Sequence, residues 1–335
     1  MKGLVALLGI VLLGALAPAA VAASFGGWSH REQRVVVGAH VMRAYAGGAF
    51  RGERSLTGDQ LRWSLGAVAE RLGVERVPFP SDGKVSVATF DRILVRQLGL
   101  RDVAAHVQRE ARTAGLLPPS RFGDEVVARQ LGLRHSHPYK DDRFELFPDD
   151  PISRAEAAWS LARIVRFKGW EVDGVREQLL AFDLPRYTLN QRRALRIAVS
   201  RIGWPYVWGG QSDTRYSDIG GWQPHGGFDC SGFVWRVYKL SGLPWGAAID
   251  GRTAAQQSSE IPRSRRLRLK DVRGGDLLFF GTAKFTSTPT EANVTHEGIA
   301  LTPEWMIQSS SQGVYLGSLT EKWRRDGFAW GRRVL

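Results

Sequence analysis

The chain of 335 residues contains one cysteine, Cys230, and it therefore cannot form an internal disulfide bond. Its fold has to be stabilised by hydrophobic cores instead, and a composition of 43% apolar residues, with 12 Trp and 15 Phe, can supply them. The length is that of two domains of ordinary size. Composition leaves three roles open for the thiol: a small buried hydrophobic group, a link between two chains, or a nucleophile.

The amino-terminal residues have the pattern of a secretory signal. Lys2 precedes an apolar run from Leu4 to Leu16, and small residues follow at 20–23. We predict a signal peptide over residues 1–23. The alternative is a membrane anchor, but the run is shorter than the ~20 apolar residues that span a bilayer, and no second such run follows. The sequence therefore predicts a secreted protein with no stable membrane span after cleavage.

The formal charge of +13 is high, and much of it lies in local clusters. Such clusters favour a polyanionic partner, and for an exported protein this is a cell-wall polymer or an anionic lipid head group rather than nucleic acid. The alternative is an ordinary solvated basic surface. The clusters are Arg263, Arg265, Arg266, Arg268, Lys270 and Arg273, followed by Lys322, Arg324, Arg325, Arg332 and Arg333.

Residues 36–170 have a helical pattern in which one design occurs three times: a hydroxyl residue at a helix start, followed by apolar residues at helical spacing. The hydroxyl residues are Thr57, Ser86 and Ser153. Ser153 and Glu156 have the spacing of a capping box, and so do Thr57 and Gln60. The pattern predicts an all-α module built from internal repeats.

The stretch "FPDDPISRAEAAWSLARIV" at 147–165 resembles the S-layer homology repeat, a two-helix unit that usually occurs in threes. In that family the repeats hold exported proteins on cell-wall polymers. The resemblance implies that residues 36–170 bind an anionic wall polymer. Only the third copy keeps the hydroxyl-Arg-Ala-Glu core, as residues 153–156, so a helical spacer without a ligand site is the alternative.

A second domain is predicted to begin after a linker. Residues 171–189 lead away from the repeats, and a new amphipathic helical pattern starts at about Asn190. We therefore assign residues 190–335 to a separate domain.

The lone thiol lies at the predicted start of a helix. The sequence "FDCSGFVWRVYKL" at 228–240 places Cys230 in the first turn, ahead of an apolar stripe. Unpaired N–H groups and the positive end of the helix dipole favour a thiolate there, so we expect a lowered pKa for Cys230. This position is typical of a nucleophile.

Among the seven histidines, His296 is the best candidate for the base that a thiol nucleophile needs. His225 is nearer in sequence but lies in a loop rich in Gly and Pro, which favours a solvent-facing side chain. The extended segments "THEGIAL" and "EWMIQSS" flank a turn at Thr302, and a hairpin about that residue puts Gln308 directly opposite His296. Gln308 would then fix the imidazole and leave its other nitrogen for Cys230.

Residues 190–335 resemble the NlpC-type cell-wall cysteine peptidases, a papain-like family of peptidoglycan endopeptidases. The match rests on several segments in the family's order and spacing. They are "RIGWPYVWGG" (201–210), "FDCSGFVWRVYKLSG" (228–242), "GRTAAQQ" (251–257), "GGDLLFF" (274–280), "THEGIAL" (295–301) and "MIQSSSQGV" (306–314). The resemblance implies an α+β papain-like domain, with amino-terminal helices packed on an antiparallel sheet, preceded by the all-α repeat module.

The resemblance also assigns roles to site residues. Cys230 would attack an amide carbonyl, His296 would take and return the proton, and Gln308 would orient the imidazole. Tyr206 would help to bind the substrate or the oxyanion. Asp229 and Ser231 would line the pocket for the stem-peptide amine, although both are also good helix-capping residues.

The predicted function is hydrolysis of an amide bond in peptidoglycan stem peptides by an exported, wall-associated enzyme. The family points to the bond between γ-D-glutamate and the diamino acid. No metal and no organic cofactor is expected, because no His, Asp or Cys cluster beyond the triad has ligand spacing. The alternatives are an N-acetylmuramoyl-L-alanine amidase or cross-bridge peptidase, and a non-catalytic wall-binding protein.

Overall fold

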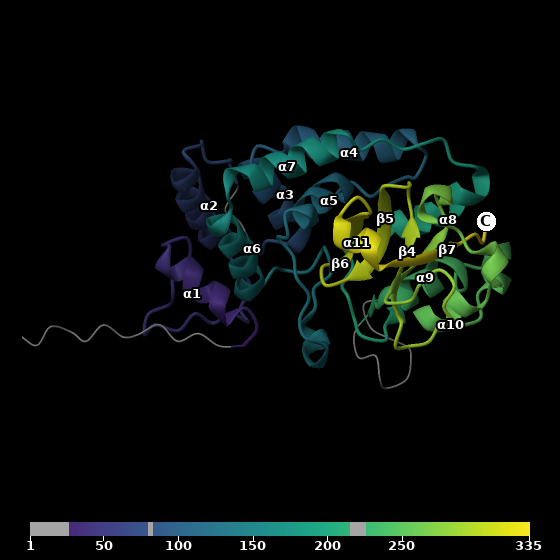
Figure 1. The fold of residues 1–335 in the computed structure, drawn as a ribbon. Coiled ribbons are helices and arrows are strands. Elements are labelled where there is room, and N and C mark those ends of the chain that lie inside the picture. Colours follow the sequence, from purple (N-terminus) through teal and green to yellow (C-terminus); the bar gives the residue numbers. More distant parts are fainter. Residues whose placement is uncertain (1–26, 80–82, 215–225) are drawn as a thin grey trace, which may run out of the picture.

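The computed structural model describes residues 27–79, 83–214 and 226–335 (Figure 1). The predicted signal peptide and His225 lie outside the described residues. None of the helices in these ranges is long and apolar enough to span a membrane. The chain forms an amino-terminal region of helices, and these lie against a region of mixed helix and sheet (Figure 1).

The amino-terminal region is helical, as predicted. Helices α4 and α7 lie side by side along one edge of the molecule, and α5 lies between this region and the sheet (Figure 1). The elements are α1 (His30–Gly38), α2 (Gly58–Leu72), α3 (Val87–Gln97), α4 (Arg101–Thr113), α5 (Phe122–Gln130), the 3-10 helix η1 (Tyr139–Phe144), α6 (Arg154–Arg166) and α7 (Gly169–Leu180).

The three predicted hydroxyl caps are confirmed. Thr57 caps α2 in a full capping box with Gln60, Ser86 caps α3, and Ser153 caps α6 by accepting from the backbone N–H of Glu156. The predicted capping box at Ser153 is wrong in its second half. The Glu156 side chain does not accept from the backbone N–H of Ser153, because its carboxylate pairs with Arg134 at 3.0 Å.

The segments that lead into these helices join in a ring. Isolated bridges pair Ser55 with Ser153, Thr57 with Lys84, and Ser86 with Pro151, so each segment contacts both of the others. The equivalent apolar residues of the segments are buried at the centre: Leu56, Val85 and Ile152. This packing agrees with internal repetition, while the identity of the repeats as S-layer homology units stays a prediction.

The segment 171–189, predicted as a linker, differs from a simple connection. Helix α7 occupies its first part, and Phe182 and Tyr187 are buried after the helix ends. The Tyr187 hydroxyl donates to the carbonyl of Leu301 at 2.9 Å. Helix α7 thus packs on α4 and α5 of the helical region, while Phe182 and Tyr187 contact Trp305 and Leu301 of the second region.

The second region contains an antiparallel five-stranded sheet in the order β6-β5-β4-β3-β7, with α9 packed against β4 and β5. This confirms the prediction of mixed helix and sheet. The helices are α8 (Leu189–Ser200), α9 (Cys230–Tyr238), α10 (Ala254–Ser259) and α11 (Lys322–Gly327), with 3-10 turns η2 (Pro244–Ala248), η3 (Arg263–Arg265) and η4 (Leu269–Asp271). The strands are β1 (Gln211–Ser212), β2 (Gly227–Phe228), β3 (Leu277–Gly281), β4 (Val294–Ala300), β5 (Trp305–Ser310), β6 (Gly313–Ser318) and β7 (Phe328–Arg332).

The two regions share one hydrophobic core, which runs from Val36 in α1 to Trp330 in β7. Helix α5 packs on β6, where the Gln130 amide donates to the carbonyl of Leu316. The neighbouring Arg129 donates to the carbonyl of Gly203 at 3.0 Å. Helix α5 of the helical region therefore contacts the second region directly.

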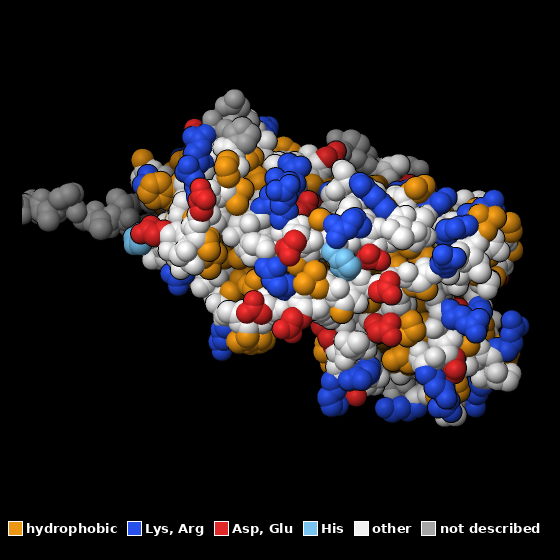
Figure 2. Space-filling view, turned by 90° about the horizontal axis from the view of Figure 1, so that it is seen from above, with side chains coloured by type: hydrophobic (Ala, Val, Ile, Leu, Met, Phe, Trp, Pro, Cys, Tyr) orange, Lys and Arg blue, Asp and Glu red, His pale blue; other side chains and the backbone are white. Residues whose placement is uncertain are grey.

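The basic clusters are not uniformly exposed. Arg266, Arg324 and Arg332 are buried, and Arg266 lies over the ring of Trp330 at 3.6 Å. On the face seen in Figure 2, Lys and Arg side chains are spread over both regions, with acidic side chains between them. Part of the positive charge in these clusters thus serves the packing of the chain rather than a partner.

Candidate active site

Cys230 is the first residue of α9, as predicted. The preceding Asp229 caps the helix by accepting from the N–H of Gly232, and its own N–H donates to the carbonyl of Gly210 at 3.0 Å. The Ser309 hydroxyl donates to the carbonyl of Phe228 at 2.7 Å and ties this helix start to β5. The thiol is thus held at the end of a helix that rests on the sheet.

The expected fall in the pKa of Cys230 is wrong. Burial raises the pKa of the thiol above its ordinary range, and the nearby carboxylates of Asp229 and Glu297 raise it further. The backbone N–H groups of Glu297 and Ser231 face the sulfur and act in the opposite direction, but they do not outweigh the burial. The resting sulfur is therefore a thiol that needs a base, and it lies beside the strand that carries His296.

His296 and Gln308 meet, although the predicted hairpin register is wrong by two residues. Ile299 faces Ile307 in the ladder between β4 and β5, so Gln308 lies across from Gly298 rather than from His296. A Cβ on Gly298 would lie 3.2 Å from the Cβ of Gln308. A shift by an even number keeps both side chains on the same face, and diagonal neighbours are within reach. The His296 Nε2 lies 2.6 Å from the Gln308 Oε1.

The imidazole of His296 is a neutral base in this site. Burial lowers its pKa to about 4, the hydrogen bond with Gln308 raises it, and the guanidinium of Arg324 lowers it. The ring of Phe280 lies 6.0 Å from the imidazole and forms part of the surroundings of His296. A neutral imidazole beside a neutral thiol can accept the proton of the thiol when sulfur attacks.

Tyr206 lies close to the thiol. Its backbone bridges to Phe228, two residues before Cys230, and the charges that raise the pKa of its phenol include those of Cys230 and Asp229. Burial is the larger cause of that rise, so the phenol stays protonated and can donate a hydrogen bond. The N–H of Trp208 donates to Asp142 of η1 at 2.8 Å, so the helical region supports this segment.

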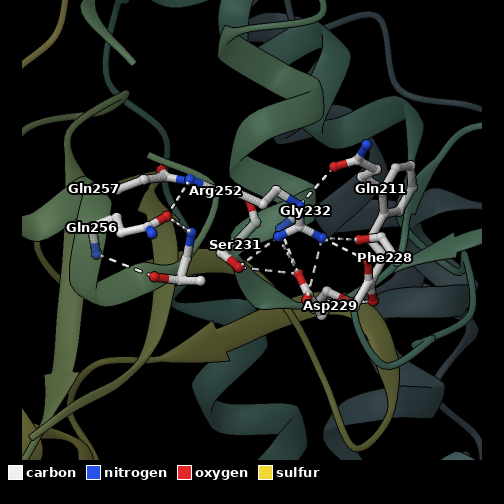
Figure 3. A network of polar contacts seen from close by, with 12 residues as sticks. Gln211, Phe228, Asp229, Ser231, Gly232, Arg252, Gln256 and Gln257 are labelled. Atoms are coloured by element: carbon white, nitrogen blue, oxygen red, sulfur yellow. Dashed lines mark hydrogen bonds and ion pairs between the residues drawn. The ribbon is translucent and has the colours of Figure 1, made fainter. Parts of the chain in front are cut away.

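Asp229 and Ser231 belong to a polar network organised by Arg252 (Figure 3). The guanidinium of Arg252 donates to Asp229 Oδ1 at 3.2 Å, to Ser231 Oγ at 2.8 Å and to the carbonyl of Gly209 at 2.7 Å. Gln211 accepts from the same guanidinium at 2.6 Å. Asp229 and Ser231, which were predicted to line a substrate pocket, therefore both have structural partners. Asp229 also caps α9.

Two functional candidates escaped the interpretation of the sequence. Arg252 lies in the segment "GRTAAQQ", so its place in that segment was the available signal. Arg324 donates to Gln308 Oε1 at 3.1 Å, and its place in a basic cluster gave no signal of this contact. Their roles depend on tertiary contacts that spacing does not reveal.

A cavity of about 520 Å³ lies beside His296 and Gln308. Its wall combines Arg129 and Gln130 of α5 with Trp323 of α11 and with residues of β3 to β6. The helical region therefore contributes to the surroundings of the imidazole. The arrangement of thiol, imidazole and amide has the parts needed for nucleophilic acyl transfer.

Comparison with known proteins identifies similarity over the second region. Residues 203–332 match the model of the NlpC/P60 family. Murein DD-endopeptidase MepH of Escherichia coli (strain K12) is 28% identical over 150 residues, which cover 43% of this chain and 47% of that protein. The gamma-D-glutamyl-L-lysine dipeptidyl-peptidase of Bacillus subtilis (strain 168) is 29% identical over 119 residues, which cover 36% of this chain and 32% of that protein.

The solved NlpC/p60 domain of peptidoglycan hydrolase SagA aligns with 43% of this chain and 99% of its own, at 26% identity and a TM-score of 0.31. The chain spans between a third and a half of the length of the first curated relatives it matches. The match to the family model thus includes the region that carries Cys230, His296 and Gln308. By that similarity, residues 203–332 are an NlpC/P60 domain.

Proposed function

We propose that the chain is an exported peptidoglycan endopeptidase that hydrolyses an amide bond in stem peptides, between γ-D-glutamate and the diamino acid. The observation that carries the proposal is the contact of His296 with Gln308, because His296 lies on β4, whose backbone N–H at Glu297 faces the Cys230 sulfur. Matched relatives include enzymes named as peptidoglycan endopeptidases, and one is named for the γ-D-glutamyl-L-lysine linkage. These names support the substrate class.

The reaction begins when His296 takes the proton of Cys230 and the sulfur attacks the amide carbonyl. The resulting oxyanion receives a hydrogen bond from the backbone N–H of Cys230, with the phenol of Tyr206 as a second donor. The C–N bond breaks, His296 gives its proton to the leaving amine, and a thioester remains on Cys230. Water, deprotonated by His296, then attacks the thioester and releases the carboxylic acid and the free thiol.

The two sides of the substrate are assigned from these proton transfers. The leaving amine has to lie next to His296, so the peptide that departs would occupy the cavity of about 520 Å³ beside it. The acyl portion would lie over Tyr206 and Asp229. The carboxylate of Asp229 could receive the stem-peptide amine there while it also caps the helix.

Two alternative activities differ from the proposal in the bond that is cleaved. The relatives include a DD-endopeptidase as well as a γ-D-glutamyl peptidase, so cross-bridge hydrolysis is a second candidate, and N-acetylmuramoyl-L-alanine amidase activity uses the same groups. A non-catalytic wall-binding protein is the remaining alternative. All three differ from the proposal in their products.

The test is the mass of the products from purified peptidoglycan and from a free stem tetrapeptide, for the native chain and for Cys230→Ala. The proposal expects a fragment of L-alanine and D-glutamate that the variant does not release. A released intact stem peptide would establish the amidase instead. If the native chain bound the wall and left both substrates intact, the proposed activity would be wrong.

We further propose that the helical region binds an anionic wall polymer. Support comes from a cavity of about 320 Å³ in which Arg154, from the hydroxyl-Arg-Ala-Glu core, lies near Arg43 and Trp63. The guanidinium carbon of Arg43 is 3.3 Å from the Trp63 ring centroid, and Trp63 is 44% exposed. Trp63 also lines a second cavity of about 610 Å³ that contains Arg62, Arg71 and Arg76.

Cosedimentation with cell walls tests this proposal. Trp63→Ala should reduce binding to intact walls, while Trp170→Ala, which removes a more exposed Trp on α7, should not. Walls stripped of teichoic-type polymer should bind neither variant nor native chain well. Equal binding of both variants and the native chain to intact walls would assign the region to a spacer.

A further inference from the structure

Arg324 makes a specific set of contacts beside the imidazole. It lies in α11, is 6% exposed, and donates through Nε to Glu321 at 2.9 Å, through one terminal nitrogen to Gln308 Oε1 at 3.1 Å, and through the other to the Tyr315 hydroxyl at 3.3 Å. A guanidinium is planar and can only donate, so these three acceptors fix both its position and its orientation.

The contact with Arg324 determines the orientation of the Gln308 amide. Because Arg324 can only donate, the atom of Gln308 that it meets has to be the carbonyl oxygen. The same oxygen lies 2.6 Å from His296 Nε2 and has no hydrogen to give, so Nε2 has to carry the proton. A neutral imidazole protonated at Nε2 has its lone pair at Nδ1, which is the nitrogen left to receive the proton of the thiol.

Gly317 of β6 makes room for this arrangement. A Cβ built at that position would lie 2.5 Å from Gln308 Nε2 and 3.2 Å from the guanidinium carbon of Arg324. The amide and the guanidinium therefore pack directly on the backbone of β6, and any larger residue would push them apart. This contact is a second and separate observation that the pair is held in place by the fold.

We propose that Arg324 is a positioning residue that orients the Gln308 amide and thereby holds His296 in the tautomer whose Nδ1 faces Cys230. The inference rests on the proposed function only in naming the reaction, since the tautomer and the reactivity of the thiol are properties of the free protein. Arg324 does not touch the substrate in this account.

The charged groups around the imidazole agree with this role. The charge of Arg324 disfavours the imidazolium, and Arg324 is itself paired with Glu321 at 2.9 Å. Arg129 of α5 lines the same cavity, but it is paired with Glu125 at 3.3 Å. From β3 the neighbour is the uncharged ring of Phe280, whose centroid lies 6.0 Å from that of the imidazole.

The test compares three variants, Arg324→Met, Arg324→Lys and Gly317→Ala. The matched control is Arg325→Met, because Arg325 is the adjacent Arg and is exposed. Ring ¹⁵N NMR of His296, assigned by comparison with His296→Ala, reports the tautomer directly. Alkylation of the only thiol by iodoacetamide, followed by intact mass against pH, reports its reactivity without substrate. Turnover of a muropeptide gives kcat and KM, and circular dichroism establishes that each variant is folded.

We expect the native chain and Arg325→Met to show one tautomer, protonated at Nε2. Arg324→Met and Gly317→Ala should show a mixture, a slower alkylation with a displaced pH profile, and a kcat lower by ~10- to 100-fold at an unchanged KM, a fraction of the ~10⁴-fold that a wrong tautomer costs. Arg324→Lys, which keeps the positive charge and a single donor nitrogen, should recover part of the loss.

A native tautomer, pH profile and kcat in folded Arg324→Met would overturn the positioning role. If the native chain hydrolysed no muropeptide while the tautomer and alkylation changed as expected, the positioning role would stand and the proposed function would fail. If only KM changed, Arg324 would belong to substrate binding, and the proposal would again be overturned.

Discussion

Charged and polar side chains are buried in the helical region and also in the second region, which carries the proposed catalytic residues (the catalytic region). The two regions satisfy these buried groups differently. In the helical region, Arg134 pairs with Glu156 at 3.0 Å and Arg129 pairs with Glu125 at 3.3 Å, so buried charges neutralise one another. In the catalytic region, a chain of contacts from Arg324 through Gln308 ends on His296.

These two arrangements of buried polar groups have different consequences. A cluster closed on itself contributes to the stability of the fold, and removing one member leaves an uncompensated charge. A chain that ends on a nitrogen with a free lone pair is prepared to act on something else, here the thiol of Cys230. Mutations in the two regions should therefore separate loss of stability from loss of chemistry.

After removal of the nucleophile itself, the largest effect on chemistry is expected from His296→Ala. Without the base, the half-buried thiol has no acceptor for its proton, so kcat/KM should fall by ~10²- to 10⁴-fold, the range that general acid–base catalysis contributes. Stopped assays on a soluble muropeptide measure this loss. A variant that kept more than a tenth of native kcat/KM would show that another group takes the proton.

The largest effect on stability is expected in the helical region, from Arg134→Met. This change removes Arg134 from buried Glu156 and Asp91, which keep only His137 at 3.6 Å and Arg129 at 4.0 Å, and it should lower the free energy of unfolding by about 3–5 kcal/mol. The double variant Arg134→Met/Glu156→Leu should recover a large part of the loss, because the unpaired carboxylate is gone. Denaturant titrations measure both, and kcat of the folded fraction should stay native.

Equal instability of the single and double variants would contradict this distinction between the regions. It would mean that the residues act through their shape rather than through their charge.

The pH dependence of activity gives an intermediate effect. His296 has to be neutral to take the thiol proton, and its pKa is lowered to about 4, so kcat/KM should hold as the pH falls towards 4 and decline about tenfold per unit below it. A profile of kcat/KM against pH, with folding followed by circular dichroism at each point, checks this. An inflection near the ordinary histidine value of ~6.5 would place the imidazole in a more solvated site than the one described.

The smallest effects are expected from the helix caps. Thr57→Ala, Ser86→Ala and Ser153→Ala each remove one side-chain acceptor at a helix start and should cost about 1 kcal/mol of stability. Thermal unfolding of the three variants measures this loss, and turnover of soluble muropeptide should not change. A reduction in kcat would show that the ring of helix starts is coupled to the catalytic region.

The sequence was informative where a structure depends on local pattern. Hydroxyl caps, the helix start at Cys230 and the strands around Thr302 follow from spacing, and the pair of His296 and Gln308 survived a register error because the error was even. Helix α7 was missed because its apolar stripe of Val172, Val175 and Leu179 is narrow, and Leu179 is its only buried residue.

Long-range contacts account for the remaining differences. The raised pKa of Cys230 comes from burial and from Glu297, which a helix-dipole argument on the local sequence does not include. The roles of Arg252 and Arg324 depend on side chains that meet across different elements, 23 and 16 residues away from Asp229 and Gln308 respectively. The contribution of α5 to the cavity beside His296 likewise joins segments far apart in the chain.

The most direct test of the central claim, that Cys230 carries the acyl group of a stem peptide, is product analysis in the presence of hydroxylamine. A thioester is intercepted by hydroxylamine, so the native chain should release the L-alanyl-D-glutamyl fragment partly as its hydroxamate, and Cys230→Ala should release neither acid nor hydroxamate. Release of the free acid alone from the native chain, or equal release by Cys230→Ala, would contradict the account.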